Sequence, residues 1–119
     1  MKEILPASRP EFCAAVVEEL VSHFAGRDDI AWGRRFGFPA FFVRGRRFAY
    51  VCARGVVAQL PEADARQRAT QPDISTMVPV GGPRGSTWVL IARERAEDYP
   101  RRDAELLEAS IAHVGERRR

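Results

Sequence analysis

The side chains that could carry out acid–base, nucleophilic or metal chemistry are few in this sequence and lie far apart. The two histidines, His23 and His113, fall near opposite ends of the chain, although helix packing could still bring them together. Cys13 and Cys52 have no Cys-x-x-Cys spacing and no neighbouring histidine, so neither a zinc site nor a redox pair is predicted. We expect both thiols to be buried and free, and we predict no catalytic residue, no metal and no cofactor.

The serines add no nucleophile to this inventory. None of them lies in the Gly-x-Ser-x-Gly context that presents an activated serine at a strand-to-helix turn. The set is Ser8, Ser22, Ser75, Ser86 and Ser110.

The arginines of one central segment have a clearer chemical meaning. No Asp or Glu occurs from residue 30 to residue 61, and the segment carries +6 while the whole chain carries +3. Its arginines are Arg34, Arg35, Arg44, Arg46, Arg47 and Arg54, and its interleaved aromatic residues include Phe38, Phe41, Phe42, Phe48 and Tyr50. Guanidinium groups pair with phosphate and exposed rings stack on bases, so one interpretation is a nucleic-acid platform. The other is that the rings form the core, with the arginines at hairpins and edges.

The glycine-rich run at residues 81–85 invites a phosphate-binding interpretation, because glycine N–H groups can point at an anion. The run lacks the Gly-Lys-Ser/Thr ending and a following helix, and residues 87–89 are typical of a strand. We therefore predict a hairpin tip.

Composition bounds the class of protein. The 119 residues fit one domain, residues 1–119, and 45% hydrophobic with 29% charged residues is typical of a globular chain. No apolar run is long enough to span a bilayer and the N-terminus does not resemble a signal peptide, so we expect a cytoplasmic protein without a membrane partner.

The first third of the chain predicts a helix followed by a meander. Ser8 is a candidate N-cap, Pro10 suits the first turn, and an apolar residue every fourth position from Phe12 to Phe24 forms one stripe that ends at Gly26. Strands are predicted at residues 31–36, 40–43, 46–53 and 56–60. Arg44-Gly45 and Arg54-Gly55 supply glycines for turns, and Gly37 and Pro39 indicate a bend or bulge.

The remainder predicts a short surface helix at residues 61–69, strands at 74–80 and 86–92, and a C-terminal helix entered near Asp98 and ending at Gly115. The apolar face of that last helix is formed by Leu106, Leu107, Ile111 and Val114. The predicted class is α+β, an antiparallel meander of about six strands with the N- and C-terminal helices packed on one face.

Residues 34–49 resemble the signature of the TfoX N-terminal-like domains. They contain an Arg-x-Phe-Gly motif, an aromatic strand and then Gly-basic-x-Phe-Ala. Residues 56–61 are similar to the family's strand into a Leu-Pro-Glu helix start, residues 80–85 to its glycine-containing hairpin, and Trp88 to the related YjbR or MmcQ proteins. The resemblance covers about residues 30–114 and implies a YjbR-like α+β sandwich.

Together these observations predict a non-enzymatic binding or regulatory module, with direct nucleic-acid binding through the arginine-rich meander as the alternative. A third class is a protein-interaction module, because an exposed sheet edge or apolar face can pair with a protein partner or with a second copy. Val51, Val57 and Trp88 are the candidate contacts if they face outward.

Overall fold

The computed structural model describes residues 9–77 and 86–116, which contain four helices and six strands. In chain order they are α1 (Pro10–His23), β1 (Ile30–Arg35), β2 (Phe38–Val43), β3 (Arg46–Cys52), β4 (Gly55–Pro61), α2 (Glu62–Arg68), β5 (Ile74–Met77), β6 (Ser86–Ile91), α3 (Asp98–Arg102) and α4 (Ala104–Gly115). The candidate cap Ser8, the end of the strand predicted at residues 74–80 and the glycine run at residues 81–85 lie outside the described residues.

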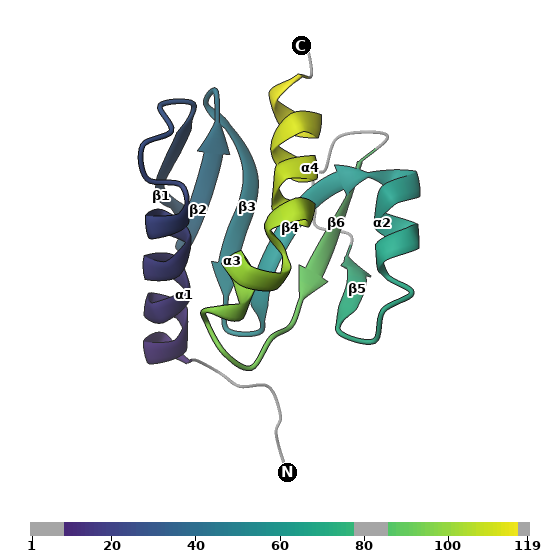
Figure 1. Cartoon of the computed structure of the whole chain (residues 1–119), viewed down its shortest axis with the longest axis horizontal. Coiled ribbons are helices and arrows are strands. Elements are labelled where there is room, and N and C mark those ends of the chain that lie inside the picture. Colours follow the sequence, from purple (N-terminus) through teal and green to yellow (C-terminus); the bar gives the residue numbers. More distant parts are fainter. Residues whose placement is uncertain (1–8, 78–85, 117–119) are drawn as a thin grey trace.

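The six described strands form one antiparallel sheet in the spatial order β1-β2-β3-β4-β6-β5 (Figure 1). Strands β1 to β4 follow one another as a meander, and the chain then leaves through α2 and returns so that β6, not β5, pairs with β4. The α+β class and the antiparallel sheet predicted from the sequence are confirmed.

Two-residue turns close the first two hairpins. Phe36 and Gly37 have φ of 57° and 85°, and Arg44 and Gly45 have φ of 53° and 81°. Two successive positive φ values define the type I′ turn, whose twist matches that of the flanking strands. The bend expected near Gly37 and Pro39 is therefore a tight turn, and β2 runs straight through Pro39.

The bulge lies instead in β3. Phe41 of β2 pairs with Ala49, but the next residue, Phe42, pairs with Arg47, which leaves Phe48 as the extra residue of β3. Phe48 and Ala49 consequently point to the same side of the sheet and both belong to the main core.

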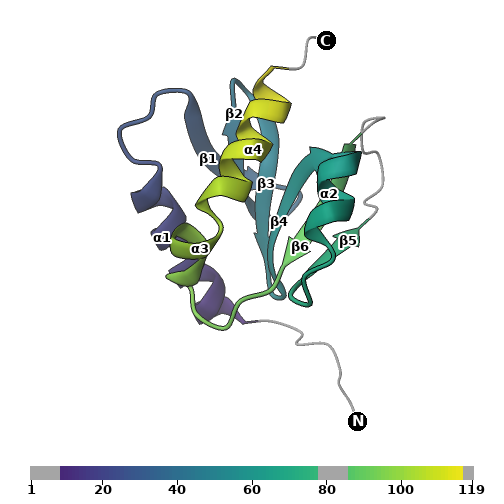
Figure 2. The same cartoon turned by 45° about the vertical axis from the view of Figure 1, so that its right-hand side comes forward.

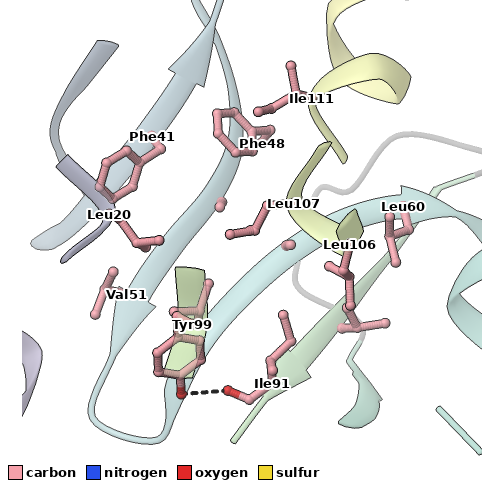
Figure 3. Packing of buried hydrophobic residues seen from close by; sticks show 14 of the residues in the cluster. Leu20, Phe41, Phe48, Val51, Leu60, Ile91, Tyr99, Leu106, Leu107 and Ile111 are labelled. Carbon is pink, nitrogen blue, oxygen red and sulfur yellow. Dashed lines mark hydrogen bonds between the residues drawn. The ribbon is translucent and has the colours of Figure 1, made fainter. Parts of the chain in front are cut away.

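All four helices cover one face of the sheet (Figures 1 and 2). Each contributes to the same buried cluster, α1 through Leu20, α2 through Ala65, α3 through Tyr99 and α4 through Leu107. The strand residues in this cluster include Phe41, Phe48, Val51, Leu60 and Ile91 (Figure 3). The packing of the terminal helices on one face is as expected, and α2 joins them there through Ala65, which is fully buried.

The C-terminal segment is two helices, whereas one was predicted. Asp103, between α3 and α4, has φ of −113°, which interrupts the helical backbone. Its carboxylate accepts two hydrogen bonds from the buried Arg93 guanidinium, with Nη2–Oδ1 of 2.7 Å and Nε–Oδ2 of 3.0 Å. Arg93 Nη1 also donates to Asp73 Oδ2 at 3.2 Å, so this ion-pair cluster joins the end of β6 to the α3–α4 junction and to the start of β5.

Tyr99 lies beside this cluster and is fully buried. Its hydroxyl donates to the Ile91 carbonyl at 2.8 Å (Figure 3). The same hydroxyl accepts a hydrogen bond from the Arg93 backbone N–H at 3.1 Å. Burial raises the pKa of Tyr99 from 10.0 to about 12, because the phenolate would lose its hydration.

A specific alkaline destabilisation follows. Between pH 10 and pH 12 the unfolded state loses the Tyr99 proton while the folded state keeps it, so stability is full below pH 10 and falls as the pH rises. We expect the free energy of unfolding to fall by about 2–3 kcal/mol over this window. Tyr99→Phe removes this slope, as urea titrations at each pH would show. In Tyr50→Phe, Tyr99 is the only remaining tyrosine, so the rise of tyrosinate absorbance with pH measures the pKa of Tyr99 directly. An ordinary tyrosine pKa in that titration would contradict the prediction.

Candidate nucleic-acid interface

The face of the sheet that carries no helix is built by alternation along the strands. Tyr50, Val57 and Leu90 pair laterally across β3, β4 and β6, and with Trp88 they form a cluster separate from the main core. One sheet face therefore packs against the helices, and the other presents its own side chains.

We call the outer part of this helix-free side the aromatic–arginine face. It comprises Arg35, Phe36, Phe38, Phe42, Arg47, Tyr50 and Trp88, contributed by β1, β2, β3, β6 and the β1–β2 turn. Its rings form a continuous row, since the Phe38 and Tyr50 centroids lie 5.5 Å apart and those of Tyr50 and Trp88 lie 5.7 Å apart.

Two arginines lie over these rings. The Arg47 guanidinium carbon is 5.0 Å from the centroids of both Tyr50 and Trp88 and 5.8 Å from that of Phe36. The Arg35 guanidinium carbon is 5.8 Å from the Phe36 centroid and 5.5 Å from that of Phe42. These are cation–π distances, each worth about 0.5–1 kcal/mol at an exposed site.

The β3 bulge is what places Arg47 on this face. Regular alternation from Ala49 would direct Arg47 toward the helices, but the extra residue Phe48 reverses the alternation. Partial burial lowers the pKa of Arg47, and the guanidinium still stays charged at neutral pH.

The outer members of the face are open to solvent, and the inner ones are covered. Phe36 is 78% exposed and Phe38 is 41% exposed, whereas Trp88 is 4% exposed. The Trp88 indole Nε1 has no hydrogen-bond partner among the described residues. This surface therefore has exposed rings at one edge and a buried indole N–H without a hydrogen-bond partner among the described residues. A buried donor without a partner is energetically costly.

The charged side chains of the described strands all have one sign. None of the six strands contains Asp or Glu, and within residues 9–77 and 86–116 every acidic residue lies in a helix or a connection. Arginine is therefore the only charged side chain that the described strands present.

The structure divides the six arginines singled out from the sequence. It brings together Arg35 and Arg47, while Arg34 lies on the opposite side of β1, where its Nη1 donates to the Gly37 carbonyl at 3.1 Å. Arg44 and Arg54 are exposed in the turns at opposite ends of β3, and Arg46 is partly buried at the start of β3. The arginines are therefore split between the aromatic–arginine face, the other side of the sheet and the turns.

The aromatic residues of the central segment divide between the core and the surface. Phe41 and Phe48 are core residues, with 1% and 0% exposure. Of the apolar residues considered as outward contacts, Val51 packs in the main core, and Val57 and Trp88 face the helix-free side but are buried. The exposed large hydrophobic residues among those described are Trp32, Phe36 and Phe38.

The histidines and cysteines lie in separate local contacts within the described part of the chain. The His23 ring at the end of α1 packs in a T-shaped arrangement with the ring of the next residue, Phe24, whereas His113 Nε2 lies 2.8 Å from Ser86 Oγ and joins α4 to β6. Cys13 and Cys52 are free and half-buried, less covered than expected, and burial raises the pKa of the Cys13 thiol. No group of three or more His, Cys, Asp or Glu side chains that could hold a metal occurs in residues 9–77 and 86–116.

A hollow of about 510 Å³ lies between α1 and the first strands, on the helix side of the sheet. Cys13 and Val17 line it from α1, and Trp32, Arg34 and Pro39 line it from β1 and β2. A smaller hollow of about 210 Å³ lies between the other end of α1 and β1 and also borders Trp32. The seam between α1 and the edge of the sheet is therefore incompletely filled on both sides of Trp32.

No family model, curated protein or solved structure matches this chain. Among the described residues, no helix has both the length and the apolar character needed to cross a bilayer.

Proposed function

We propose that this protein is a non-enzymatic binding module whose aromatic–arginine face binds single-stranded nucleic acid. The observation that carries the proposal is the row of rings from Phe38 through Tyr50 to Trp88, with Arg35, Arg47 and the exposed Phe36 beside it, in a sheet whose described strands contain no carboxylate. Rings stack on bases and guanidinium groups pair with phosphates, so the two residue types together fit a nucleic-acid strand.

The geometry favours a single strand over a duplex. A base can stack on a protein ring only when its own faces are free, and bases inside a duplex are already stacked on one another. Within residues 9–77 and 86–116 this face also carries no helix that would enter a major groove. Arginine contacts alone would favour neither form, so the exposed rings decide the preference.

The proposal keeps the other part of the sequence-based hypothesis, a TfoX N-terminal-like binding or regulatory role. The support is the hairpin with the Arg-x-Phe-Gly motif, which supplies Arg35, Phe36 and Phe38 to the proposed surface. In this proposal the motif serves as the binding edge of the sheet as well as its first turn.

The test is binding of a fluorescent single-stranded oligothymidine, measured by anisotropy at low and moderate salt, beside a duplex of equal length. Phe36→Ala is expected to weaken single-strand binding by about five- to 150-fold, because one stacked base contributes about 1–3 kcal/mol. Phe36→Leu should weaken single-strand binding by the same factor, since leucine keeps the apolar bulk but offers no ring to a base.

Two arginine variants supply the matched control. Arg35→Ala should lower the slope of log affinity against log salt by about 0.7, the contribution of one phosphate contact on a single strand. Arg54→Ala removes a charge that is also exposed, in the β3–β4 turn, and should leave the slope unchanged. Absence of single-strand binding at low salt, or equal losses for both arginine variants, would contradict the proposal.

A further inference from the structure

Strand β1 forms one edge of the sheet and has β2 as its only strand neighbour among the described residues. It is six residues long, whereas the strand at the opposite edge, β5, has four described residues. A free edge presents a row of backbone donors and acceptors to which another strand can add.

The exposed apolar side chains concentrate at this edge. Trp32 of β1 is 51% exposed, and the other two exposed large hydrophobic residues, Phe36 and Phe38, belong to the turn that follows β1 and to the start of β2. Trp32 lies on the helix side, where it stacks with Phe41 at 6.4 Å and borders both hollows beneath α1. The edge therefore combines free backbone groups with unfilled apolar space.

The hairpin geometry identifies the free backbone groups. Arg35 and Phe38 flank a two-residue turn, so they form a hydrogen-bonded pair, and odd-numbered residues of β1 bond to β2. The Arg44 N–H donates to the Asp29 carbonyl at 3.2 Å, so the odd-numbered residue directly before β1 also bonds toward β2. The N–H and C=O groups of Ile30, Trp32 and Arg34 consequently point away from the sheet.

Two copies of this segment that run antiparallel would place opposite charges next to each other. Asp28 and Asp29 precede the strand and Arg34 and Arg35 end it, with apolar residues and one glycine between them. A second copy that runs antiparallel, with Trp32 opposite Trp32, would pair Ile30 with Arg34 through their free backbone groups. The same register sets Arg35 directly opposite Asp29 of the other copy, whose carboxylate also accepts hydrogen bonds from Arg27 of its own chain at 3.1 and 3.2 Å.

We propose that two copies of this chain associate through β1, antiparallel and with the twofold axis at Trp32, to form one continuous sheet. This axis is perpendicular to the sheet, so the helix sides of both copies lie on the same side. The two Trp32 rings become cross-strand neighbours next to the hollows beneath α1, and two symmetric Arg35–Asp29 pairs set the register. The inference does not depend on nucleic-acid binding.

The test is sedimentation velocity of the full chain without nucleic acid over a wide range of concentration. The wild type should dimerise, and Arg35→Asp and Asp29→Arg should each weaken the dimer by about tenfold or more, because each places like charges opposite one another twice. An equimolar mixture of the two variants should recover dimers, since both cross-strand pairs are then of opposite charge.

A backbone variant tests the register independently of charge. Arg34→Pro removes an N–H that points away from β2, so the β1–β2 hairpin remains and the added strand loses a hydrogen bond. It should abolish the dimer, while the control Arg34→Ala should retain it. Hydrogen exchange should show protected amides at Ile30, Trp32 and residue 34 in the wild type and in Arg34→Ala, and Ile30 and Trp32 should lose that protection in Arg34→Pro. A wild type that stays monomeric at every concentration, or a dimer that survives Arg34→Pro, would overturn the proposal.

Discussion

Replacing Asp103 with alanine is expected to lower the free energy of unfolding by about 3–5 kcal/mol, the usual cost of leaving one charge of a buried ion pair without its partner. The side chains of Arg93 and Asp103 are each only 3% exposed, and they share two hydrogen bonds. Asp73, the remaining partner of Arg93, is 53% exposed at its side chain and makes a single contact of 3.2 Å. It cannot replace the lost carboxylate, because it lies largely in water.

The matched control is Glu108→Ala. Like Asp103→Ala, it removes a carboxylate that binds an arginine, in this case one on α4. Glu108 pairs with Arg27 at 2.6 Å, but its side chain is 49% exposed, so water compensates for the loss. We expect a change below about 1 kcal/mol there. Urea unfolding of both variants measures the difference, and equal effects would show that the Arg93 cluster is not the anchor of the C-terminal helices.

Gly55→Ala is expected to destabilise the protein by about 3–5 kcal/mol or to prevent folding, because two costs add at one atom. Gly55 has φ of 144°, a conformation that residues with a side chain rarely adopt. A Cβ there would lie 2.2 Å from the Ile91 carbonyl oxygen and 2.7 Å from the Tyr99 hydroxyl. The Ile91 carbonyl belongs to β6 and accepts the Tyr99 hydrogen bond, so it cannot move aside cheaply.

Gly37→Ala separates the two costs. Gly37 has φ of 85° in the first hairpin turn, but a Cβ at that position meets nothing within 4 Å. Only the backbone strain applies, which is about 1–2 kcal/mol. The midpoint temperature of thermal unfolding should therefore be well above that of Gly55→Ala in the Gly37→Ala variant. If the two variants unfold at the same temperature, the close approach of β4 to Ile91 and Tyr99 contributes nothing.

The parts of the fold that were predictable are those specified by residues close together in sequence. The stripe on α1 and the Arg44-Gly45 turn depend on residues near one another in sequence, and the structure confirms the helix, the hairpin and the antiparallel sheet. The break between α3 and α4 was missed because its cause is distant. Asp103 departs from helical geometry where it binds Arg93, ten residues earlier in the connection that follows β6.

The candidate site was only partly predictable for the same reason. The sequence identified the arginines and the aromatic residues, but it could not show which of them share a face. Simple alternation along β3 would place Arg47 on the helix side. One extra residue, Phe48, reverses that assignment.

The sequence by itself determined most of the helices and strands, the antiparallel class of the sheet and the chemical character of the central segment, because helix periodicity, turn glycines and charge composition are local properties. Only the tertiary structure decided that Arg47 meets Tyr50 and Trp88, that Arg34 lies on the other side of β1, and that Gly55 has no room for a methyl group. Each of these depends on strand register and on contacts between strands distant in sequence, where a shift of one residue moves a side chain to the opposite face.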